Sequence, residues 1–356
     1  VWLTEQIYSD LQSYKESTGM FEYSDMISKF VEEDKCPPLH CVFLDEAQDL
    51  SPLQWDMFFY IESKCARSYI AGDDDQTIYT FQGADPDIFI ELKGVADPQI
   101  KSRRVPRKIH KLAESIFPHM TNRLKKKWEP RDAEGNIYND IPFQDIDFSK
   151  GNWMILTRTN KMLTALKDHL YDLNLRFDAK QQELLPKKML NAYRVWKRLN
   201  EGAFVNKEDL KDLWDYLTVK QGHLVRGYAS SKTVESVDSI NIEGLREHYG
   251  LRATGGWETL NFPENSKIYI RTILKSGDDL MKPARIKLST IHSVKGEECD
   301  NVVLFTDLER IIYESAQNDA DAEHRTFFVG ITRAKENLFI VNQDYEYQYN
   351  IGAPII

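Results

Sequence analysis

Six short apolar segments constrain the fold of this chain more than any other feature of its sequence. They lie at residues 40–44, 68–71, 153–156, 285–290, 301–305 and 338–341. Apolar runs of this length are typical of strands that a parallel sheet buries on both faces. Helical patterns lie between several of them, for example at 52–64, 106–116 and 161–173. Strands that alternate with helices predict an α/β fold built on parallel sheet.

The strand segments fall into two groups, one before residue 130 and one after residue 150. The polar stretch 129–150, rich in Asp, predicts the connection between them. The second group is interrupted from about 181 to 282, where the pattern is mainly helical. We therefore predict two sheet domains and a helical subdomain inserted into the second.

Composition excludes several classes of protein. Of the 356 residues, 42% are hydrophobic and 29% are charged, which is an ordinary globular balance. No apolar run approaches the ~18 residues of a membrane span, and no signal-peptide pattern opens the chain. The four cysteines have neither CxxC spacing nor histidines at zinc-finger spacing, so we predict reduced thiols. These features together predict a cytoplasmic protein with no membrane partner.

The net charge of −10 hides a sharp asymmetry along the chain. Residues 41–100 contain twelve Asp or Glu and three Lys or Arg, whereas residues 101–131 contain eleven Lys or Arg and two Asp or Glu. An acidic block followed at once by a basic block suggests a metal site beside an anion-binding surface. A solvated, charged helix is the alternative for the basic run at 123–127.

The strongest local motif is the acidic pair Asp45-Glu46, which directly follows the strand segment 40–44. Open α/β sheets bind their ligands at the carboxyl ends of strands. In a nucleoside triphosphatase, the first carboxylate holds Mg²⁺, a hard cation that prefers oxygen ligands. The second carboxylate is then free to orient and deprotonate the attacking water.

A second motif follows the strand segment 68–71, where Gly72 and three aspartates precede Gln76. The amide of Gln76 could contact a γ-phosphate or position the water. Tyr79 and Phe81 could offer ring faces to unpaired bases, each stack contributing about 1–3 kcal/mol. Core packing for the two rings, and a solvated charged loop for the aspartates, are the alternatives.

Together with later segments in the same order, these two motifs resemble the UvrD/Rep/PcrA group of superfamily 1 DNA helicases. The segments that carry the resemblance are 45–49, 72–79, 102–109, 122–128, 153–160, 288–298 and 328–335. The resemblance implies two RecA-like domains with ATP bound in the cleft between them. It also implies an ATP-dependent 3′→5′ helicase that acts on single-stranded and duplex DNA.

The resemblance further implies a role for individual residues. Asp45 would hold Mg²⁺ and Glu46 would act as the general base. The γ-phosphate and the rest of the nucleotide would be contacted by Gln76, Arg104, Gly296, Glu298 and Arg333, with Glu298 at the ribose. The DNA would be contacted by Tyr79, Phe81, Arg158, Asn160, Thr290 and His292.

The resemblance also gives domain boundaries. Residues 1–130 would belong to the first RecA-like domain, 131–180 with 283–356 to the second, and 181–282 to the inserted subdomain. Arg104 and Arg333 would then lie on different domains and reach one phosphate together when the cleft closes. A cycle of closing and opening would pull a bound single strand through the protein.

One element of such a motor is missing from the sequence. A loop ending in GK[ST] cradles the phosphates in these proteins, yet none of the seventeen glycines is followed by lysine. We expect that the chain begins after this loop, that the first RecA-like domain is incomplete, and that the chain alone is inactive. Two alternatives stay open: a non-catalytic nucleic-acid-binding piece, and a metal-dependent nuclease that uses Asp45, Asp73 and Asp75.

Overall fold

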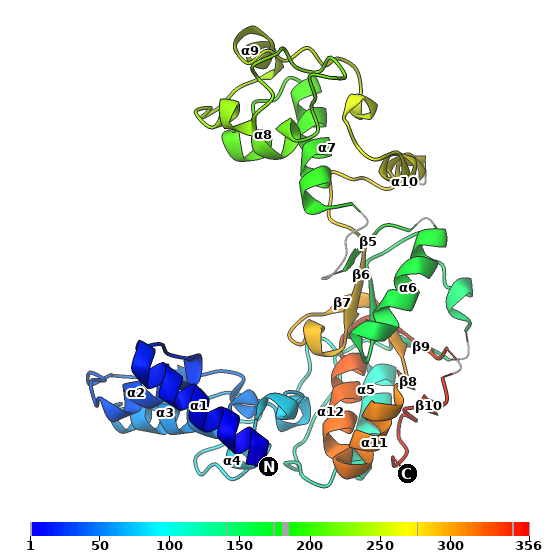
Figure 1. Cartoon of the computed structure of the whole chain (residues 1–356). Coiled ribbons are helices and arrows are strands. Elements are labelled where there is room, and N and C mark those ends of the chain that lie inside the picture. Colours follow the sequence, from blue (N-terminus) through cyan, green and yellow to red (C-terminus); the bar gives the residue numbers. More distant parts are fainter. Residues whose placement is uncertain are drawn as a thin grey trace. The chain divides into compact units, whose positions relative to one another are not determined.

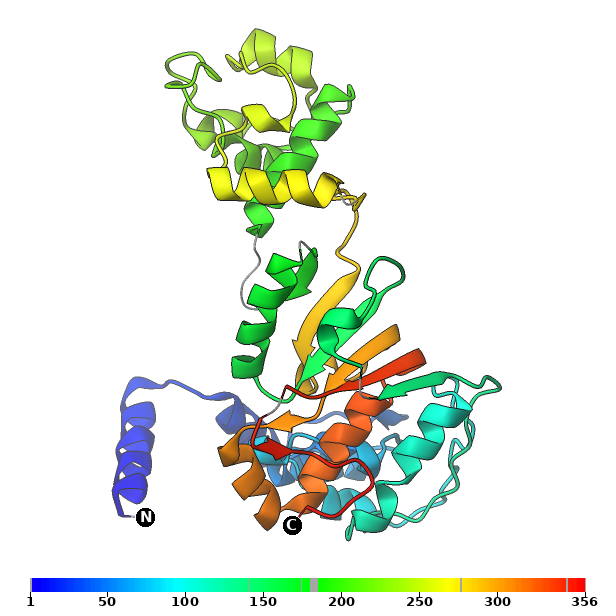
Figure 2. The same cartoon turned by 90° about the vertical axis from the view of Figure 1, so that its right-hand side faces the viewer.

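The computed structural model describes residues 2–139, 141–173, 175–179, 185–275, 277–343 and 345–355. The chain forms two compact units (Figures 1 and 2). Unit 1 comprises Val1–Asp140 and Ile291–Ile356, and unit 2 comprises Ile141–Thr290. No helix among the described residues is both long enough and apolar enough to cross a bilayer.

The chain has the predicted α/β fold. Six strands form one sheet in the order β3-β9-β7-β4-β6-β5. Unit 1 contributes β3 (Asn136–Asn139), β9 (Ala334–Val341) and β7 (Cys299–Phe305), which pair in parallel. Unit 2 contributes β4 (Trp153–Thr157), β6 (Ile286–Thr290) and β5 (Phe177–Ala179), which also pair in parallel.

All six predicted strand segments are strands, but β3 and β5 were not predicted, and neither were the two-residue strands β8 (Asp307–Leu308) and β10 (Tyr347–Gln348). Strand β3 lies inside the stretch 129–150, which we expected to be a connection. Its four residues are polar or half-exposed because it is the last strand in the sheet order. An edge strand of this kind lacks the apolar signature of a strand buried on both faces.

The amino-terminal part of unit 1 is a small α/β layer. Helices α1 (Trp2–Thr18) and α2 (Tyr23–Glu32) precede β1 (Val42–Leu44), α3 (Pro52–Ser63) and β2 (Ser68–Ile70), and α2 packs beside α3 (Figure 1). Strands β1 and β2 pair in parallel, with Leu44 opposite Ile70. A capping box at Ser51 and Pro52 at the first helical position set the start of α3. Buried Trp55 and Phe58 of α3 belong to the apolar cluster against which Leu44 of β1 and Ile70 of β2 pack.

The rest of unit 1 surrounds its three strands of the six-stranded sheet. Helix α5 (Arg107–Glu114) and helix α12 (Ala320–Ile331) contact each other beside these strands, as Figure 2 shows. Side-chain amides of Asn136, Asn337 and Asn301 hydrogen-bond across β3, β9 and β7, at 2.9 and 2.7 Å. This ladder fixes the register of the strands. Other elements of unit 1 are α4 (Pro86–Ile90), β8 (Asp307–Leu308), α11 (Arg310–Asn318) and β10 (Tyr347–Gln348).

Unit 2 joins its three strands to a helical region. Helix α6 (Asn160–Asp172) follows β4, and α7 (Lys187–Asn200), α8 (Lys207–Trp214), α9 (Ile242–His248) and α10 (Glu264–Lys275) lie between β5 and β6. These four helices share one apolar core that includes the buried side chains of Trp196 and Trp214. Of the predicted insertion 181–282, residues 181–184 and 276 lie outside the described residues.

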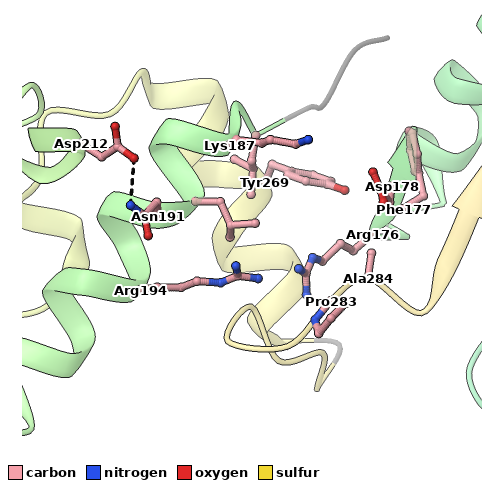
Figure 3. Close-up of a pocket in the computed structure, with 12 residues that line it drawn as sticks. Arg176, Phe177, Asp178, Lys187, Asn191, Arg194, Asp212, Tyr269, Pro283 and Ala284 are labelled. Atoms are coloured by element: carbon pink, nitrogen blue, oxygen red, sulfur yellow. Dashed lines mark hydrogen bonds between the residues drawn. The ribbon is translucent and has the colours of Figure 1, made fainter. Parts of the chain in front are cut away.

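Two arginines connect the strands of unit 2 to this helical region. Arg176 donates to the backbone carbonyls of Asp279 (2.9 Å) and Lys282 (2.7 Å), and Arg194 of α7 donates to those of Leu280 (2.7 Å) and Lys282 (3.1 Å). Both side chains line an open cavity of about 410 Å³ (Figure 3). The arginines therefore hold the chain segment that returns from α10 to β6.

Candidate nucleotide and nucleic-acid site

Two acidic loops emerge side by side from the carboxyl ends of β1 and β2 in unit 1. After β1, Asp45 and Glu46 are both exposed, and the backbone of Glu46 is left-handed with φ 52°. The carboxylate of Asp45 accepts a hydrogen bond from the backbone N–H of Glu46 at 2.9 Å. The sharp turn presents both carboxylates to solvent, as a metal ligand and a water-activating base require.

Gln48 connects the first acidic loop to the second. Its side chain is fully buried, donates from Nε2 to Glu46 Oε2 at 2.6 Å, and accepts from the backbone N–H of Asp73 at 2.9 Å. A Cβ atom on Gly72 would lie 2.6 Å from the amide oxygen of Gln48, which explains the glycine at this position. The two loops are therefore held at a fixed spacing by one buried amide.

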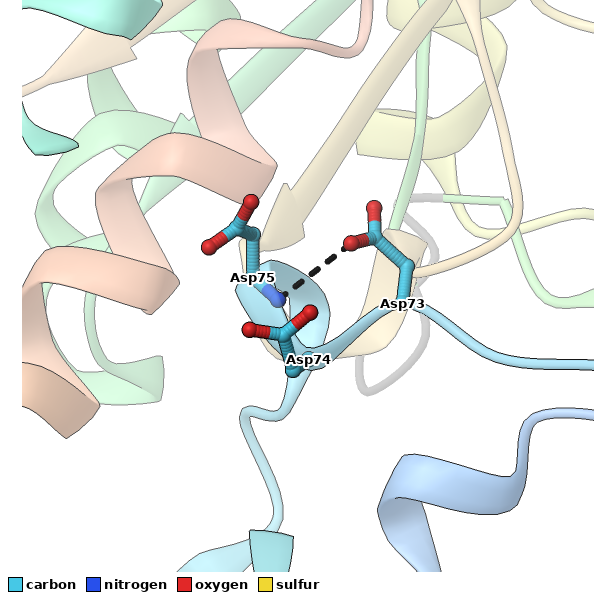
Figure 4. A group of neighbouring side chains, drawn as sticks. All are labelled: Asp73, Asp74 and Asp75. Carbon is cyan, nitrogen blue, oxygen red and sulfur yellow. Dashed lines mark hydrogen bonds between the residues drawn. The ribbon is translucent and has the colours of Figure 1, made fainter. Parts of the chain in front are cut away.

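The second acidic loop is neutralised by the protein itself. Asp73, Asp74 and Asp75 lie close enough together to share an ion (Figure 4). However, the ammonium of Lys126 contacts all three carboxylates, at 3.1 Å from Asp75, and Arg123 makes two 2.8 Å hydrogen bonds to Asp75. The backbone N–H of Leu124 donates to Asp74 at 2.7 Å.

This cluster changes the interpretation of the acidic and basic blocks. We expected a metal site beside an anion-binding surface. Instead, Lys126 and Arg123 of the basic block form ion pairs with the three aspartates of the acidic block. Burial is the largest single influence on the pKa of Asp73 and acts to raise it. The charge and hydrogen bond of Lys126 and the other contacts of Asp73 outweigh burial, so the pKa is lowered. The nuclease alternative loses two of its three proposed metal ligands, Asp73 and Asp75, to these cations.

An arginine from the carboxyl-terminal part of the chain reaches the same two loops. Arg333, which follows α12, is fully buried and donates from Nη2 to the amide oxygen of Gln76 at 3.2 Å. Gln76 in turn donates to Asp73 at 2.6 Å. Arg333 also donates from Nε to the backbone carbonyl of Val329 at 2.9 Å, from Nη1 to that of Glu297 at 3.1 Å, and from Nη2 to the hydroxyl of Thr332 at 3.2 Å. The guanidinium is therefore held rigidly beside Gln76.

Arg104 lies near Arg333, although 229 residues separate them in the sequence. Burial, and then the charge of Arg104, lower the pKa of Arg333, whereas Glu46 and Glu298 oppose that change. Burial also lowers the pKa of Arg104, and its Nε atom is buried without a hydrogen-bond partner among the described residues. Two desolvated guanidinium groups that retain N–H donors for further hydrogen bonds are suited to binding an oxyanion.

Sequence reasoning gave no role to Lys295, which lies between the two loops. The side chain is 7% exposed, and its ammonium contacts Asp49 and donates to the backbone carbonyl of Gln76 at 2.7 Å. It also lies 3.6 Å from Glu46 Oε2. Burial raises the pKa of Asp49, although Lys295 opposes that effect. The lysine was visible in the segment 288–298, but nothing in the sequence indicates its proximity to Asp49, 246 residues away.

Tyr79, Phe81 and His292 form an aromatic group at the edge of this site. The hydroxyl of Tyr79 donates to the backbone carbonyl of His292 at 2.9 Å, and the rings of Phe81 and His292 meet edge to face at 5.5 Å. Phe81 is 68% exposed. An exposed ring supported by two others is suited to stacking on an unpaired base. The core-packing alternative therefore does not hold for Phe81.

The remaining predicted residues divide between the two units. In unit 1, Gly296 has φ 83°, and Glu298 is half-exposed at 3.6 Å from Lys335. In unit 2, Arg158 and Asn160 follow β4, and Thr290 ends the neighbouring strand β6, opposite Thr157. The predicted DNA contacts of unit 2 thus lie at the carboxyl ends of two adjacent strands.

Asp45 and Glu46 supply the kind of ligand that Mg²⁺ prefers. Both side chains are exposed carboxylates, and one oxygen of Asp45 is fixed by the N–H of the next residue. Neither carboxylate is buried in an ion pair of the kind that Asp74 forms with Lys126. The donor set therefore fits a magnesium ion bound at Asp45.

Comparison with known proteins identifies two matching domains. Residues 3–96 match the UvrD/REP helicase N-terminal domain, and residues 261–345 match the UvrD-like helicase C-terminal domain. The ATP-dependent DNA helicase Rep of Buchnera aphidicola is 22% identical over 60% of this chain and 35% of its own length. The protein named "Putative ATP-dependent DNA helicase YjcD" of Bacillus subtilis is 22% identical over 94% of this chain and 57% of its own length.

This chain spans about a third to somewhat over half of the length of these two relatives. A solved structure of the arterivirus nonstructural protein 10 helicase covers 91% of this chain and 52% of that protein, with 10% identity and a TM-score of 0.35. The N-terminal domain match precedes the C-terminal domain match along the chain, in agreement with the order of motifs in the sequence.

Proposed function

The chain belongs to the UvrD/REP family of superfamily 1 helicases, and we propose that it works as part of an ATP-dependent DNA translocase that unwinds duplex DNA. The 3′→5′ polarity is that of the group its motifs resemble. The observation that carries the proposal is the hydrogen bond from Arg333 to Gln76, beside the exposed carboxylate of Glu46. A base, an amide and a guanidinium thus surround one site.

In this proposal, each group has one task in phosphoryl transfer. Glu46 accepts a proton from the attacking water, and Gln76, fixed by Arg333 and Asp73, orients that water or the γ-phosphate. Arg104 and Arg333 neutralise the charge that builds up on the phosphate oxygens. Asp45 holds Mg²⁺, which when bound offsets phosphate charge. Gly296 and Glu298 contact the nucleotide. They flank Glu297, whose backbone carbonyl accepts a hydrogen bond from Arg333.

Nucleic-acid binding in this proposal uses the exposed aromatic edge. Phe81 supplies a stacking face, supported by His292 and Tyr79. Arg158, Asn160 and Thr290 contribute backbone contacts from unit 2. The predicted domain boundaries, with the first RecA-like domain ending near residue 130, belong to the same proposal.

The test of catalysis is Glu46→Gln in the native protein that contains this chain. We expect the rate of ATP hydrolysis with single-stranded DNA to fall by about 10²–10⁴-fold, because the glutamine cannot accept the proton. Binding of a non-hydrolysable ATP analogue should persist, because the substitution preserves shape. Glu91→Gln, at an exposed position after α4, is the matched control. Undiminished turnover in Glu46→Gln would refute the role of the base.

The test of nucleic-acid binding is Phe81→Ala in this chain, followed by fluorescence anisotropy with a labelled oligothymidylate. Loss of one stacking face should weaken binding by about 1–3 kcal/mol. Phe204→Ala removes another exposed ring, in unit 2, and should leave the affinity unchanged. Equal affinity of the Phe81→Ala and unsubstituted chains would contradict the stacking role.

A second candidate function is nucleic-acid binding without hydrolysis. It is favoured by the sequence observation that none of the seventeen glycines precedes a lysine, so that the 356 residues contain no GK[ST] loop. The aromatic group would bind DNA in the same way. Measurable ATP hydrolysis by the 356-residue chain alone would argue against this candidate.

A further inference from the structure

Lys295 links the two acidic loops to the segment that supports the aromatic group. Its ammonium contacts Asp49 in the first loop and the carbonyl of Gln76 in the second. Three residues earlier, the carbonyl of His292 accepts the hydroxyl of Tyr79, and the His292 ring meets that of Phe81. The short segment 292–295 is thus anchored at both ends, one at the ring that would stack on a base and one at the carboxylates.

Stability is a weak explanation for this buried lysine. The side chain is 7% exposed and its partner Asp49 is 17% exposed, so both charges are largely withdrawn from water. Burying an ion pair costs several kcal/mol per ion in lost hydration, and apolar replacements are often equally stable. The second oxygen of Asp49 is moreover buried without a hydrogen-bond partner among the described residues. An imperfectly satisfied buried pair suggests a role other than stability.

The position of the ammonium indicates what that role is. It lies 3.6 Å from Glu46 Oε2 and 5.4 Å from the ring centre of Tyr79. One charge therefore attracts the carboxylate that would act as the base and also faces the ring that supports His292. A shift of the segment 292–295 would change both contacts.

We propose that Lys295 is a positioning residue that couples bound single-stranded DNA to hydrolysis by placing Glu46. Bases stacked on Phe81 fix the segment 292–295, and Lys295 then fixes the carboxylate loop at the spacing that hydrolysis requires. This inference rests on the proposed function, because it assigns a regulatory contact to the same site.

The experiment measures ATP hydrolysis by the native protein that contains this chain, with and without oligothymidylate, for Lys295→Met. We expect kcat with DNA to fall by about 100-fold, since a displacement of about 1 Å in a catalytic group has that effect. The ratio of stimulated to basal hydrolysis should approach one. KM for ATP and Kd for oligothymidylate should stay within about 3-fold, because the residue is placed to touch neither ligand.

Two further variants separate positioning from a general loss of structure. Lys295→Arg retains the charge and should recover part of the stimulation ratio. Asp49→Asn removes one partner of the ammonium and should lower the ratio less than Lys295→Met does. The exposed Lys125→Met is the matched control and should behave as the unsubstituted protein.

The outcomes distinguish this inference from the proposed function. Lys295→Met with an unchanged stimulation ratio, in a protein whose Glu46→Gln variant is inactive, would overturn the inference alone. Weakened oligothymidylate binding in Lys295→Met, equal to that of Phe81→Ala, would also overturn it, because the residue would then merely support the aromatic group. Full activity of Glu46→Gln would instead overturn the proposed function.

Discussion

The two acidic loops of unit 1 have nearly the same composition, but their adjacent carboxylates lie in opposite environments, and of the acidic residues in the first loop only Asp49 is largely buried. Both follow short parallel strands, and both carry three acidic residues within five positions. After β1, Asp45 and Glu46 are exposed; after β2, Asp74 and Asp75 are buried against Lys126 and Arg123. Carboxylates that the protein neutralises itself hold the structure together, and carboxylates that it leaves open are free to bind a metal and a water.

The largest effect should come from removing the cation of the second loop. Lys126→Met leaves three carboxylates, two of them almost fully buried, with Arg123 as the remaining side-chain cation in the cluster. Removing one partner of a buried ion pair leaves the other charge buried and unpaired. We therefore expect a loss of about 3 kcal/mol in the free energy of unfolding. Urea denaturation measures it. Lys125→Met, at an exposed neighbour, should change stability by less than about 0.5 kcal/mol.

A smaller loss should follow when the bridge between the loops is cut. Gln48→Ala leaves the backbone N–H of Asp73 without its acceptor and releases Glu46. An unsatisfied buried donor costs about 1–3 kcal/mol, and we expect a value near the middle of that range from urea denaturation. Gln54→Ala is the matched control, because it removes the same side-chain volume and also removes an amide that accepts a backbone hydrogen bond, at the start of α3. A loss for Gln48→Ala no greater than about 0.5 kcal/mol would contradict its role as a bridge.

The second loop should also make stability depend on acidity. Lys126 helps to lower the pKa of Asp73 below its ordinary value of 3.8. Because the pKa of Asp73 is lower in the folded state than in the unfolded state, its stabilising contribution is fully present above the ordinary value of 3.8. That contribution is lost as the pH falls through the lowered pKa of the folded state. We therefore expect the free energy of unfolding to decline below about pH 4, and to decline less in Lys126→Met. Parallel pH profiles for the two proteins would contradict the pairing.

The smallest effect should come from the open loop. Asp45→Asn and Glu46→Gln each keep the oxygen that accepts the observed hydrogen bond. Because both side chains are exposed, the free energy of unfolding should change by less than about 0.5 kcal/mol. Thermal and urea unfolding measure this directly. A large loss in either variant would mean that the first loop is structural as well, and the contrast between the loops would disappear.

Apolar segments made the α/β fold predictable, because a strand buried on both faces needs an unbroken apolar run. All six predicted strands exist, and α3, α5 and α6 begin within one residue of their predicted ranges. Strand β3 escaped prediction because it is polar, and β5 because an exposed aspartate separates its two buried apolar residues. Strands β8 and β10, with two residues each, are too short to form an apolar run. Their pairing depends on neighbours supplied by distant parts of the chain.

The candidate site was predictable in part for a similar reason. Asp45, Glu46 and Gln76 follow strand ends, and a strand end places such residues at one edge of a sheet regardless of what surrounds it. Lys295 could not be found in this way. Its partners lie far from it in the sequence, and a single lysine in a polar segment has no pattern of its own.

The order and spacing of motifs in the sequence established the family and the strands that carry its acidic residues. Tertiary structure alone decided which acids are open and which are neutralised, because the deciding cations come from positions as far as 48 residues away for Arg123 and Asp75, and 246 residues away for Lys295 and Asp49. Local sequence fixes where a carboxylate enters a sheet edge. The electrostatic environment of that carboxylate depends on charges that folding brings within a few ångströms.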